Sequence, residues 1–143
     1  MAPPPIALRY RLHVPCAALR DLLVDARTLS RASGSTAVSK PEVGGSYSTH
    51  DGVASGTYLE LTDTKIVLSW RLRDWADADV ARVVLSLTPH SATSTDVTCT
   101  VSGMPEEDRF AHAGVSDVVR AGWQNLFRGL QRFCGLGLDD LDE

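Results

Sequence analysis

Cysteine is scarce in this chain of 143 residues, and its three positions are far apart. Cys16, Cys99 and Cys134 form no CxxC pair, whereas disulfide frameworks and zinc sites need closer and more regular spacing. We therefore expect three buried free thiols in a protein of a reducing compartment, and no metal site.

Long apolar runs are missing as well. No stretch approaches the roughly 18 uninterrupted apolar residues that a membrane-spanning helix needs. The first ten residues, MAPPPIALRY, have neither the basic start nor the long apolar core of a secretory signal. These absences predict a cytoplasmic protein without a membrane partner.

The sequence has little net charge once its last five residues are set aside. The formal charge is -4, and the terminal segment DDLDE carries four of the 18 acids, so the remaining acids balance the 14 lysines and arginines. We expect residues 1–138 to form a single domain, followed by a solvated acidic tail at residues 139–143. A neutral domain offers weak electrostatic steering and lacks the basic stripe that nucleic-acid binding requires.

Known catalytic motifs are absent from the chain. It contains no G-x-S-x-G elbow, no P-loop and no G-x-G-x-x-G loop, and its four histidines are scattered. His50 and Asp51 form the one adjacent histidine–acid pair, on an expected hairpin turn where an aspartate serves the backbone. Glu106, Glu107 and Asp108 indicate a helix start, because carboxylates complement the positive end of the helix dipole. The sequence thus indicates no catalytic residue, no metal ligand and no cofactor.

Hydrophobic periodicity is what the sequence does contain. Alternation over residues 6–14 predicts a half-exposed strand, and helical spacing over residues 15–29 predicts a helical segment after it. A long amphipathic helix is expected over residues 115–133, with Gly135 as its C-cap and with Val118 and Phe133 in its buried stripe. Further strands, separated by turn signals such as Asp51–Gly52, are expected at residues 46–50, 53–61, 65–72, 80–87 (ending before Pro89) and 94–103.

Strands grouped together with helices at the ends predict an α+β fold. A curved antiparallel sheet, made of the first strand and about five or six further strands, is expected to wrap around the long C-terminal helix. Trp70 then faces the helix, whereas Arg71 and Arg73 face away from it. Trp75 follows the strand among several aspartates, so we expect it to be partly exposed.

Trp70 on the sheet and Trp123 on the helix have two readings. In the first reading, they line a cavity for an apolar ligand in a cleft under the curved sheet. In the second, both side chains fill the core. The residues that would line such a cavity are Leu68, Trp70, Val83, Leu85, Val119, Trp123 and Leu126.

Four segments in order carry a family resemblance: GTYLELTDTKIVLSWRLRDW, GMP, GWQNLF and RFCGLG. Together they resemble the C-terminal domain of the activator of heat-shock protein 90 ATPase, a member of the helix-grip superfamily. The most specific matching positions are Trp70, Arg71, Trp75, Gly103, Pro105, Gly122 and Trp123, and the other matches are Gly56, Glu60, Leu61, Ile66, Val67 and Phe133.

The resemblance implies a helix-grip fold and a function as a non-enzymatic co-chaperone in the stress response. Such a domain would bind heat-shock protein 90 and modulate its ATPase cycle. The spacing between Gly103 and Gly122 is longer than is usual in that family, and the chain lacks the asparagine- and tryptophan-containing motif of the activator's N-terminal domain. Since a second linked contact raises effective concentration, we expect the chain alone to bind the chaperone weakly.

Two other classes of function stay open. One is a carrier of a small apolar molecule, held between the sheet and the C-terminal helix. The other is an enzyme of the cyclase or hydratase type, for which the sequence offers no acid–base pair. A dry, filled interior favours the co-chaperone, whereas a cavity with convergent polar groups favours the carrier or the enzyme.

Overall fold

Strand β1 (Ile6–Leu12) shows how the sheet acquires one buried face. Ile6, Leu8, Tyr10 and Leu12 are buried, and the residues between them point outward, as the alternation predicts. β1 pairs antiparallel with β7 (Ser94–Ser102) on one side and with β8 (Leu138–Asp140) on the other. The computed structural model describes residues 3–106 and 114–142.

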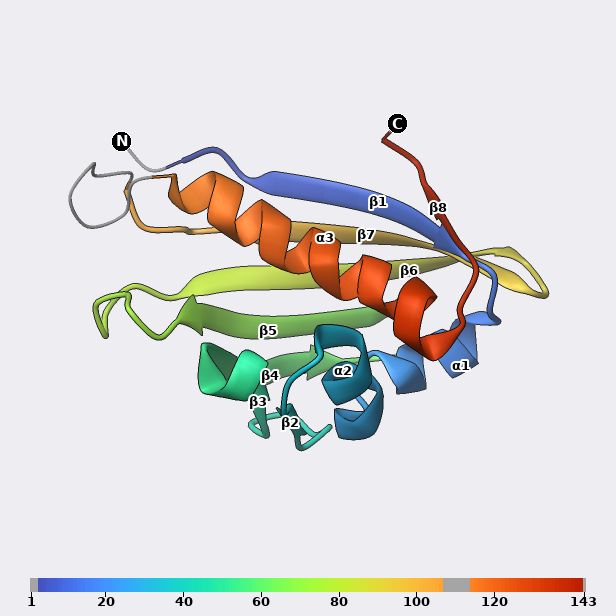
Figure 1. Cartoon of the computed structure of the whole chain (residues 1–143), viewed down its shortest axis with the longest axis horizontal. Coiled ribbons are helices and arrows are strands. Elements are labelled where there is room, and N and C mark those ends of the chain that lie inside the picture. The colour runs from blue at the N-terminus through green and yellow to red at the C-terminus, as the bar shows by residue number, and fades with distance from the viewer. Residues whose placement is uncertain (1–2, 107–113, 143) are drawn as a thin grey trace.

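The described strands form one antiparallel sheet in the order β2-β3-β4-β5-β6-β7-β1-β8 (Figure 1). The α+β class and the curved sheet are confirmed, but the sheet has eight strands, whereas the first strand and about five or six further ones were expected. The additional strands are short ones, which carry no readable periodicity. The remaining strands are β2 (Val38–Ser39), β3 (Ser46–Thr49), β4 (Ala54–Leu61), β5 (Lys65–Leu72) and β6 (Ala81–Ser91).

Helix α3 (Val115–Cys134) crosses the buried face of the sheet (Figure 1). Its bounds agree with the prediction, and Gly135 ends it in the left-handed conformation with φ of 73°. Val119, Trp123 and Leu130 are buried against the sheet. Val118 and Phe133 were expected in the same stripe but are 55% and 52% exposed. Periodicity locates the centre of an apolar stripe, whereas its edges depend on what covers the helix.

The segment after β1 is two helices where one helical segment was predicted. α1 (Cys16–Leu22) ends before Asp25, whose carboxylate accepts a hydrogen bond of 2.9 Å from the Thr28 N–H and caps α2 (Ala26–Ser33). Hydrogen bonds from Thr28 hold the pKa of Asp25 below its usual range. α2 packs against α3 so closely that a Cβ on Gly129 would lie 1.9 Å from the carbonyl oxygen of Ala32.

Strand β6 continues to Ser91, although the sequence predicted a break at Pro89. Pro89 faces Thr95 in the ladder with β7, and the register shifts between Pro89 and Ser91. Proline donates no ladder hydrogen bond and is tolerated in a sheet at such an irregularity.

The acidic C-terminal residues belong to the sheet and are not the solvated tail that the sequence predicted. Leu138, Asp139 and Asp140 form β8 and pair with β1 in register. The Leu141 N–H continues the pairing by donating to the Arg9 carbonyl at 3.0 Å. Without β8, strand β1 would present an unpaired edge, so this segment covers a row of backbone donors and acceptors.

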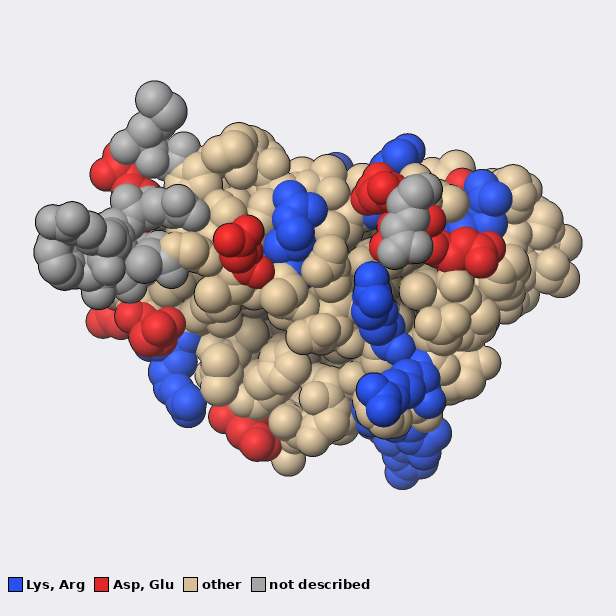
Figure 2. Space-filling model, turned by 45° about the horizontal axis from the view of Figure 1, so that its top comes forward, with Lys and Arg blue, Asp and Glu red and all other residues tan. Residues whose placement is uncertain are grey.

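Charged side chains are unevenly placed on the face drawn in Figure 2. Some basic side chains form one continuous band, whereas other basic side chains lie singly beside acidic ones. Acids and basic residues nearly balance over residues 1–138, but their uneven placement still produces local electrostatic fields at the surface. No helix among the described residues is long and apolar enough to cross a bilayer.

Two glycines on α3 give a matched test of the helix contacts. Gly129→Ala should lower the free energy of unfolding by about 1–3 kcal/mol, because the new methyl group would collide with the α2 backbone. Gly122→Ala should raise it by about 1 kcal/mol, since nothing lies within 4 Å of the added carbon and alanine favours a helix. Urea denaturation of both variants measures the difference, and equal midpoints would contradict the close crossing of α2 and α3.

Candidate functional site

The three tryptophans of the chain form one buried cluster. Trp70 on β5 lies with its ring centroid 5.9 Å from that of Trp123 on α3, at an interplanar angle of 45°. Trp75 meets Trp70 edge-on, with centroids 5.7 Å apart. Both separations are in the range in which aromatic pairs attract. Trp70 and Trp123 thus lie on facing surfaces of the sheet and the helix, as predicted.

Trp75 is 5% exposed, so the expectation that it is partly exposed was wrong. Its N–H donates to the Leu72 carbonyl at 3.1 Å, which turns the chain back toward β5 immediately after the strand. The Arg71 guanidinium donates to the Trp75 carbonyl and pairs with Asp77 at 3.8 Å. Arg71 leaves β5 on the face away from Trp70, but its head group fastens the turn that returns Trp75 to the core.

Two glycines of the family motif, Gly56 and Gly103, have structural roles. A Cβ on Gly56 would lie 1.6 Å from the Ser69 carbonyl oxygen, so only glycine permits β4 to lie this close to β5. Gly103 has φ of 74°, a conformation that side chains other than glycine rarely adopt. Pro105 is buried. Gly56 and Gly103 therefore serve the backbone of the sheet, whereas a Cβ on Gly122 would meet no atom within 4 Å.

A cavity of about 170 Å³ lies beside the cluster, between α3 and strands β3 to β5. Trp70, Trp123 and Leu126, all predicted cavity residues, line it. The other four predicted residues do not line it and are buried in the core: Leu68, Val83, Leu85 and Val119. Sequence reasoning missed the other residues that line the cavity, which are Tyr47, Thr49, His50, Val53, Ala54, Leu72, Val118 and Gly122.

The missed residues come mainly from the β3–β4 hairpin, which borders the cavity together with residues 118–126 of α3. Nothing in the local sequence signals this approach, because it depends on how far the sheet curves. Gly122 is the exception, since a glycine in the apolar stripe of a helix leaves room beside its neighbours. A Cβ on Gly122 would meet no atom within 4 Å.

The chemistry of the cavity wall is mostly apolar. No carboxylate is among the described residues that line it. Burial raises the pKa of Tyr47 well above its usual range, so its phenol stays neutral. The indole nitrogen of Trp123 is buried without a hydrogen-bond partner among the described residues. The wall can hold a small apolar molecule, but it presents no acid–base pair to act on one.

Asp51 serves the backbone, as the sequence predicted. His50 and Asp51 belong to a 3-10 turn, η1 (His50–Gly52), and both have positive φ, 54° and 56°. The Asp51 carboxylate accepts the Thr36 N–H at 3.0 Å, and its own N–H donates to the Thr36 carbonyl at 3.0 Å. These two bonds fix the turn between β3 and β4, which is longer than the two-residue hairpin that Asp51–Gly52 suggested.

The remaining candidate groups lie apart from the cavity. Cys16, Cys99 and Cys134 are free; Cys99 is buried, whereas the other two are half-buried and not fully buried as expected. Of the acids expected to start a helix, Glu107 and Asp108 lie outside the described residues. Within the described part of the chain, no group of three histidine, cysteine or acidic side chains could hold a metal ion.

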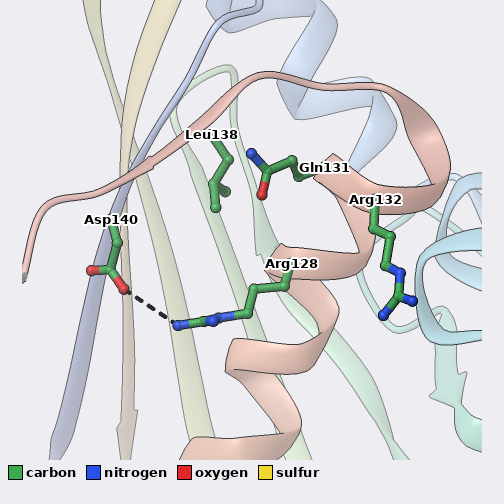
Figure 3. A pocket seen from close by; sticks show the side chains of 5 residues that line it. All are labelled: Arg128, Gln131, Arg132, Leu138 and Asp140. Carbon is green, nitrogen blue, oxygen red and sulfur yellow. Dashed lines mark ion pairs between the residues drawn. The ribbon is translucent and has the colours of Figure 1, made fainter.

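A second, more open hollow of about 530 Å³ lies between the last turns of α3 and strand β8 (Figure 3). It is lined by Arg128, Gln131, Arg132, Leu138 and Asp140. Arg128 and Asp140 approach each other across the hollow, with 3.9 Å between Nη2 and Oδ2. This wall is charged, in contrast to the aromatic cavity.

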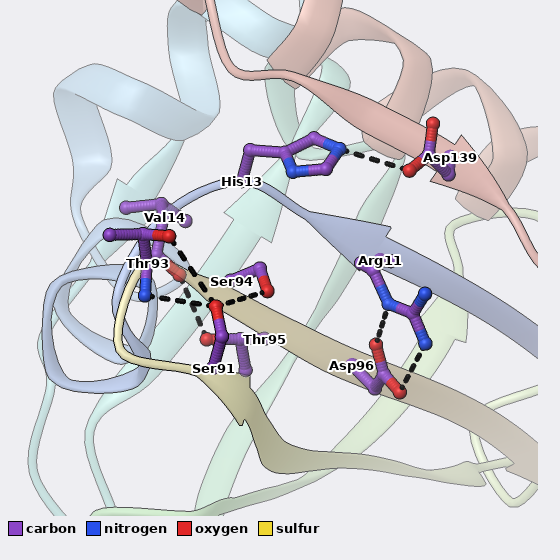
Figure 4. A network of polar contacts seen from close by, with 9 residues as sticks. All are labelled: Arg11, His13, Val14, Ser91, Thr93, Ser94, Thr95, Asp96 and Asp139. Carbon is purple, nitrogen blue, oxygen red and sulfur yellow. Dashed lines mark hydrogen bonds and ion pairs between the residues drawn. The ribbon is translucent and has the colours of Figure 1, made fainter.

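Ion pairs and hydrogen bonds fasten β1 to the strands on either side (Figure 4). His13 Nε2 lies 2.9 Å from the Asp139 carboxylate on β8, and Arg11 donates to Asp96 on β7 at 2.7 Å. The Arg11 hydrogen bond holds the pKa of Asp96 below its usual range. The stability from this pair is therefore present at neutral pH and is lost as the pH falls through that lowered pKa.

Comparison with protein families gives one match that covers most of the chain. A family model described as Activator of Hsp90 ATPase homolog 1-like protein matches residues 13–135. Among curated proteins, the chain is 40% identical over 62 residues to the Activator of 90 kDa heat shock protein ATPase homolog 2 of Mus musculus. The matched segment is 43% of this chain and 19% of that relative.

Solved structures share the fold over nearly the whole chain. An HSP90 activator from Plasmodium falciparum superposes with a TM-score of 0.88 and 28% identity, covering 94% of this chain and 99% of the other. The Aha1 dimer from Colwellia psychrerythraea gives 0.70 at 13% identity over 92% and 96% of the two chains. CalU16 from Micromonospora echinospora gives 0.69 at 18% identity over 90% and 74%. The last two likenesses concern the fold alone.

Each tryptophan of the cluster should contribute substantially to stability. Trp70→Ala, Trp75→Ala and Trp123→Ala should each lower the free energy of unfolding by about 3–5 kcal/mol, because each removes a buried aromatic ring. Leu59→Ala is the matched control: its side chain is 47% exposed and should cost less than about 0.5 kcal/mol. Denaturation monitored by circular dichroism measures all four, and a Trp75 variant as stable as the control would contradict its place in the cluster.

Proposed function

This chain belongs to the family of Activator of Hsp90 ATPase homolog 1-like proteins, and we propose that it binds HSP90 and modulates its ATPase cycle. The family match over residues 13–135 carries this proposal. The superposition on the Plasmodium falciparum HSP90 activator supports it, because 28% identity accompanies nearly complete coverage of both chains. The chain spans 19% of the murine relative, so the activity of that whole protein is part of the proposal.

The chain acts in this proposal as a regulator and not as an enzyme. A partner without catalytic groups changes the turnover of another protein by binding one of its conformations more tightly than the others. The cavity wall, with no carboxylate among its described residues, supports a role of this kind. We place the protein in the cytoplasm, as a co-chaperone built on one helix-grip unit that includes the acidic C-terminal strand.

A small-molecule carrier is the second candidate, and the aromatic cavity is the observation that favours it. The cavity measures about 170 Å³, whereas sites for drug-sized ligands span roughly 300–1,000 Å³. A cavity of about 150 Å³ is large enough for benzene. The volume therefore limits a ligand to a single small ring, and this limit places the carrier second.

The co-chaperone proposal predicts a nucleotide-dependent affinity for HSP90. If the chain prefers one state of HSP90, a non-hydrolysable ATP analogue that shifts the same equilibrium must change the affinity of the chain for HSP90. The factor equals the one by which the chain changes the affinity of HSP90 for the analogue. We expect saturable binding in titration calorimetry, at least a fivefold change in Kd with the analogue, and a rise in ATPase rate at saturation.

Two results would contradict this prediction. Binding with equal affinity in the presence and absence of the analogue would leave no differential free energy to drive a shift. No detectable heat or rate change with the chain at about 100 μM would exclude HSP90 as the partner. An ATPase measurement with a specific HSP90 inhibitor subtracts the background of other ATPases.

The carrier candidate predicts that filling the cavity abolishes ligand binding. Benzene titrated into the wild-type chain should shift the tryptophan-cluster signals in a proton–carbon NMR spectrum and saturate. Gly122→Leu should remove that saturable shift, because its side chain would enter the cavity that Gly122 leaves open. Gly122→Ala is the smaller control. HSP90 binding that survives Gly122→Leu unchanged would show that the cavity does not serve the co-chaperone function.

A further inference from the structure

Four arginines form a surface where α2 meets the last turns of α3, and we refer to them as the arginine surface. Arg27 and Arg31 lie on α2, Arg128 and Arg132 lie on α3, and all four are exposed. Arg27 and Arg31 flank one hollow of about 130 Å³, and Arg128 and Arg132 flank another of about 270 Å³. Figure 2 shows one band of basic side chains with no acidic side chain within the band.

The sequence of the two helices concentrates positive charge on this surface. Residues 26–34 and 118–137 contain five arginines and neither an acid nor a lysine. The close approach of Gly129 to Ala32 brings the two segments together. A charge of this density, in a chain of net charge -4, produces a local positive field.

Helix dipoles explain only part of this arrangement. Arg31 and Arg132 lie in the last turns of their helices, where a cation stabilises the negative end of the dipole. Arg27 lies in the first turn of α2, where a cation is unfavourable, and Arg128 lies well before the end of α3. Arg31 and Arg132 form no ion pair with a carboxylate of the described residues, whereas Arg27 lies within electrostatic reach of the Asp25 carboxylate. The surface thus holds more positive charge than the helices require.

One end of the surface already receives a carboxylate from the same chain. Asp140 on β8 lies 3.9 Å from Arg128 across the hollow that Arg132 also lines (Figure 3). Arginine is suited to binding carboxylates because its planar guanidinium can donate two parallel hydrogen bonds to one carboxylate. Phe133, 52% exposed and stacked with Arg132 at 5.4 Å, adds an apolar contact next to the charges.

We infer that the arginine surface binds an acidic segment of the partner protein, with carboxylates on the four arginines and an apolar side chain on Phe133. The inference rests on the proposed function and names the surface by which this chain recognises its partner. A nucleic acid fits less well. Its phosphate backbone would extend past Arg128 toward Asp140, which lines the same hollow and would repel it.

Charge reversal on each helix tests the inference. Arg27→Glu combined with Arg132→Glu should weaken binding to HSP90 and to a fluorescein-labelled deca-glutamate peptide at least tenfold, as measured by titration calorimetry and fluorescence anisotropy in about 50 mM salt. Arg73→Glu combined with Arg82→Glu makes the same charge change at exposed positions outside the surface and should alter either affinity less than twofold. Circular dichroism of both double variants verifies that they fold.

The outcomes separate this inference from the proposed function. If wild-type chain binds HSP90 and the Arg27/Arg132 variant binds it equally well, the inference is wrong and the proposed function stands. If wild-type chain does not bind HSP90, the proposed function fails, and the deca-glutamate titration alone decides the inference. Equal losses in both double variants, or tighter binding of a labelled single-stranded DNA 12-mer than of deca-glutamate, would also overturn it.

Discussion

Helix α3 has one wide apolar stripe, and a sheet must curve to cover it. Trp123 at the centre of that stripe meets Trp70 on β5, and Phe127 stacks on Tyr10 of β1 with ring centroids 4.7 Å apart. A large aromatic side chain removes about 150–250 Å² from water, and each Å² contributes about 25 cal/mol. Trp75 also meets Trp70 edge-on, so these contacts between the sheet and α3 bring together five large aromatic rings of the described residues.

This constraint explains why the most specific sequence motif of the chain is structural. Arg71 fastens the turn that returns Trp75 to Trp70, and Gly56 lets β4 approach the backbone of β5. Such residues are recognisable in the sequence because the strands and turns that they hold set the number of residues between them. The arginine surface lies elsewhere, on the outer sides of α2 and α3, where the fold tolerates many side chains.

Charge behaves differently from apolar burial in this molecule. Composition alone indicates a nearly neutral domain, yet acids gather around β8 and arginines gather around α2 and α3. Exposed charges separated by more than about 8 Å are screened at physiological salt, so the distribution decides what a partner meets. The C-terminal acids are used within the fold, since Asp139 on β8 pairs with His13, which follows β1, and Asp142 pairs with Arg9 on β1.

The sequence by itself determined the α+β class, the bounds of α3, the alternation of β1 and the family, because periodicity and motif spacing are local properties that the core enforces. It also identified Trp70 and Trp123 as partners across the core. Tertiary structure decided the rest. Trp75 is buried because a turn carries it back, residues 138–140 form a strand because β1 has a free edge, and the β3–β4 hairpin borders the cavity because the sheet curves. Each of these depends on contacts between residues distant in the chain, which local periodicity does not encode.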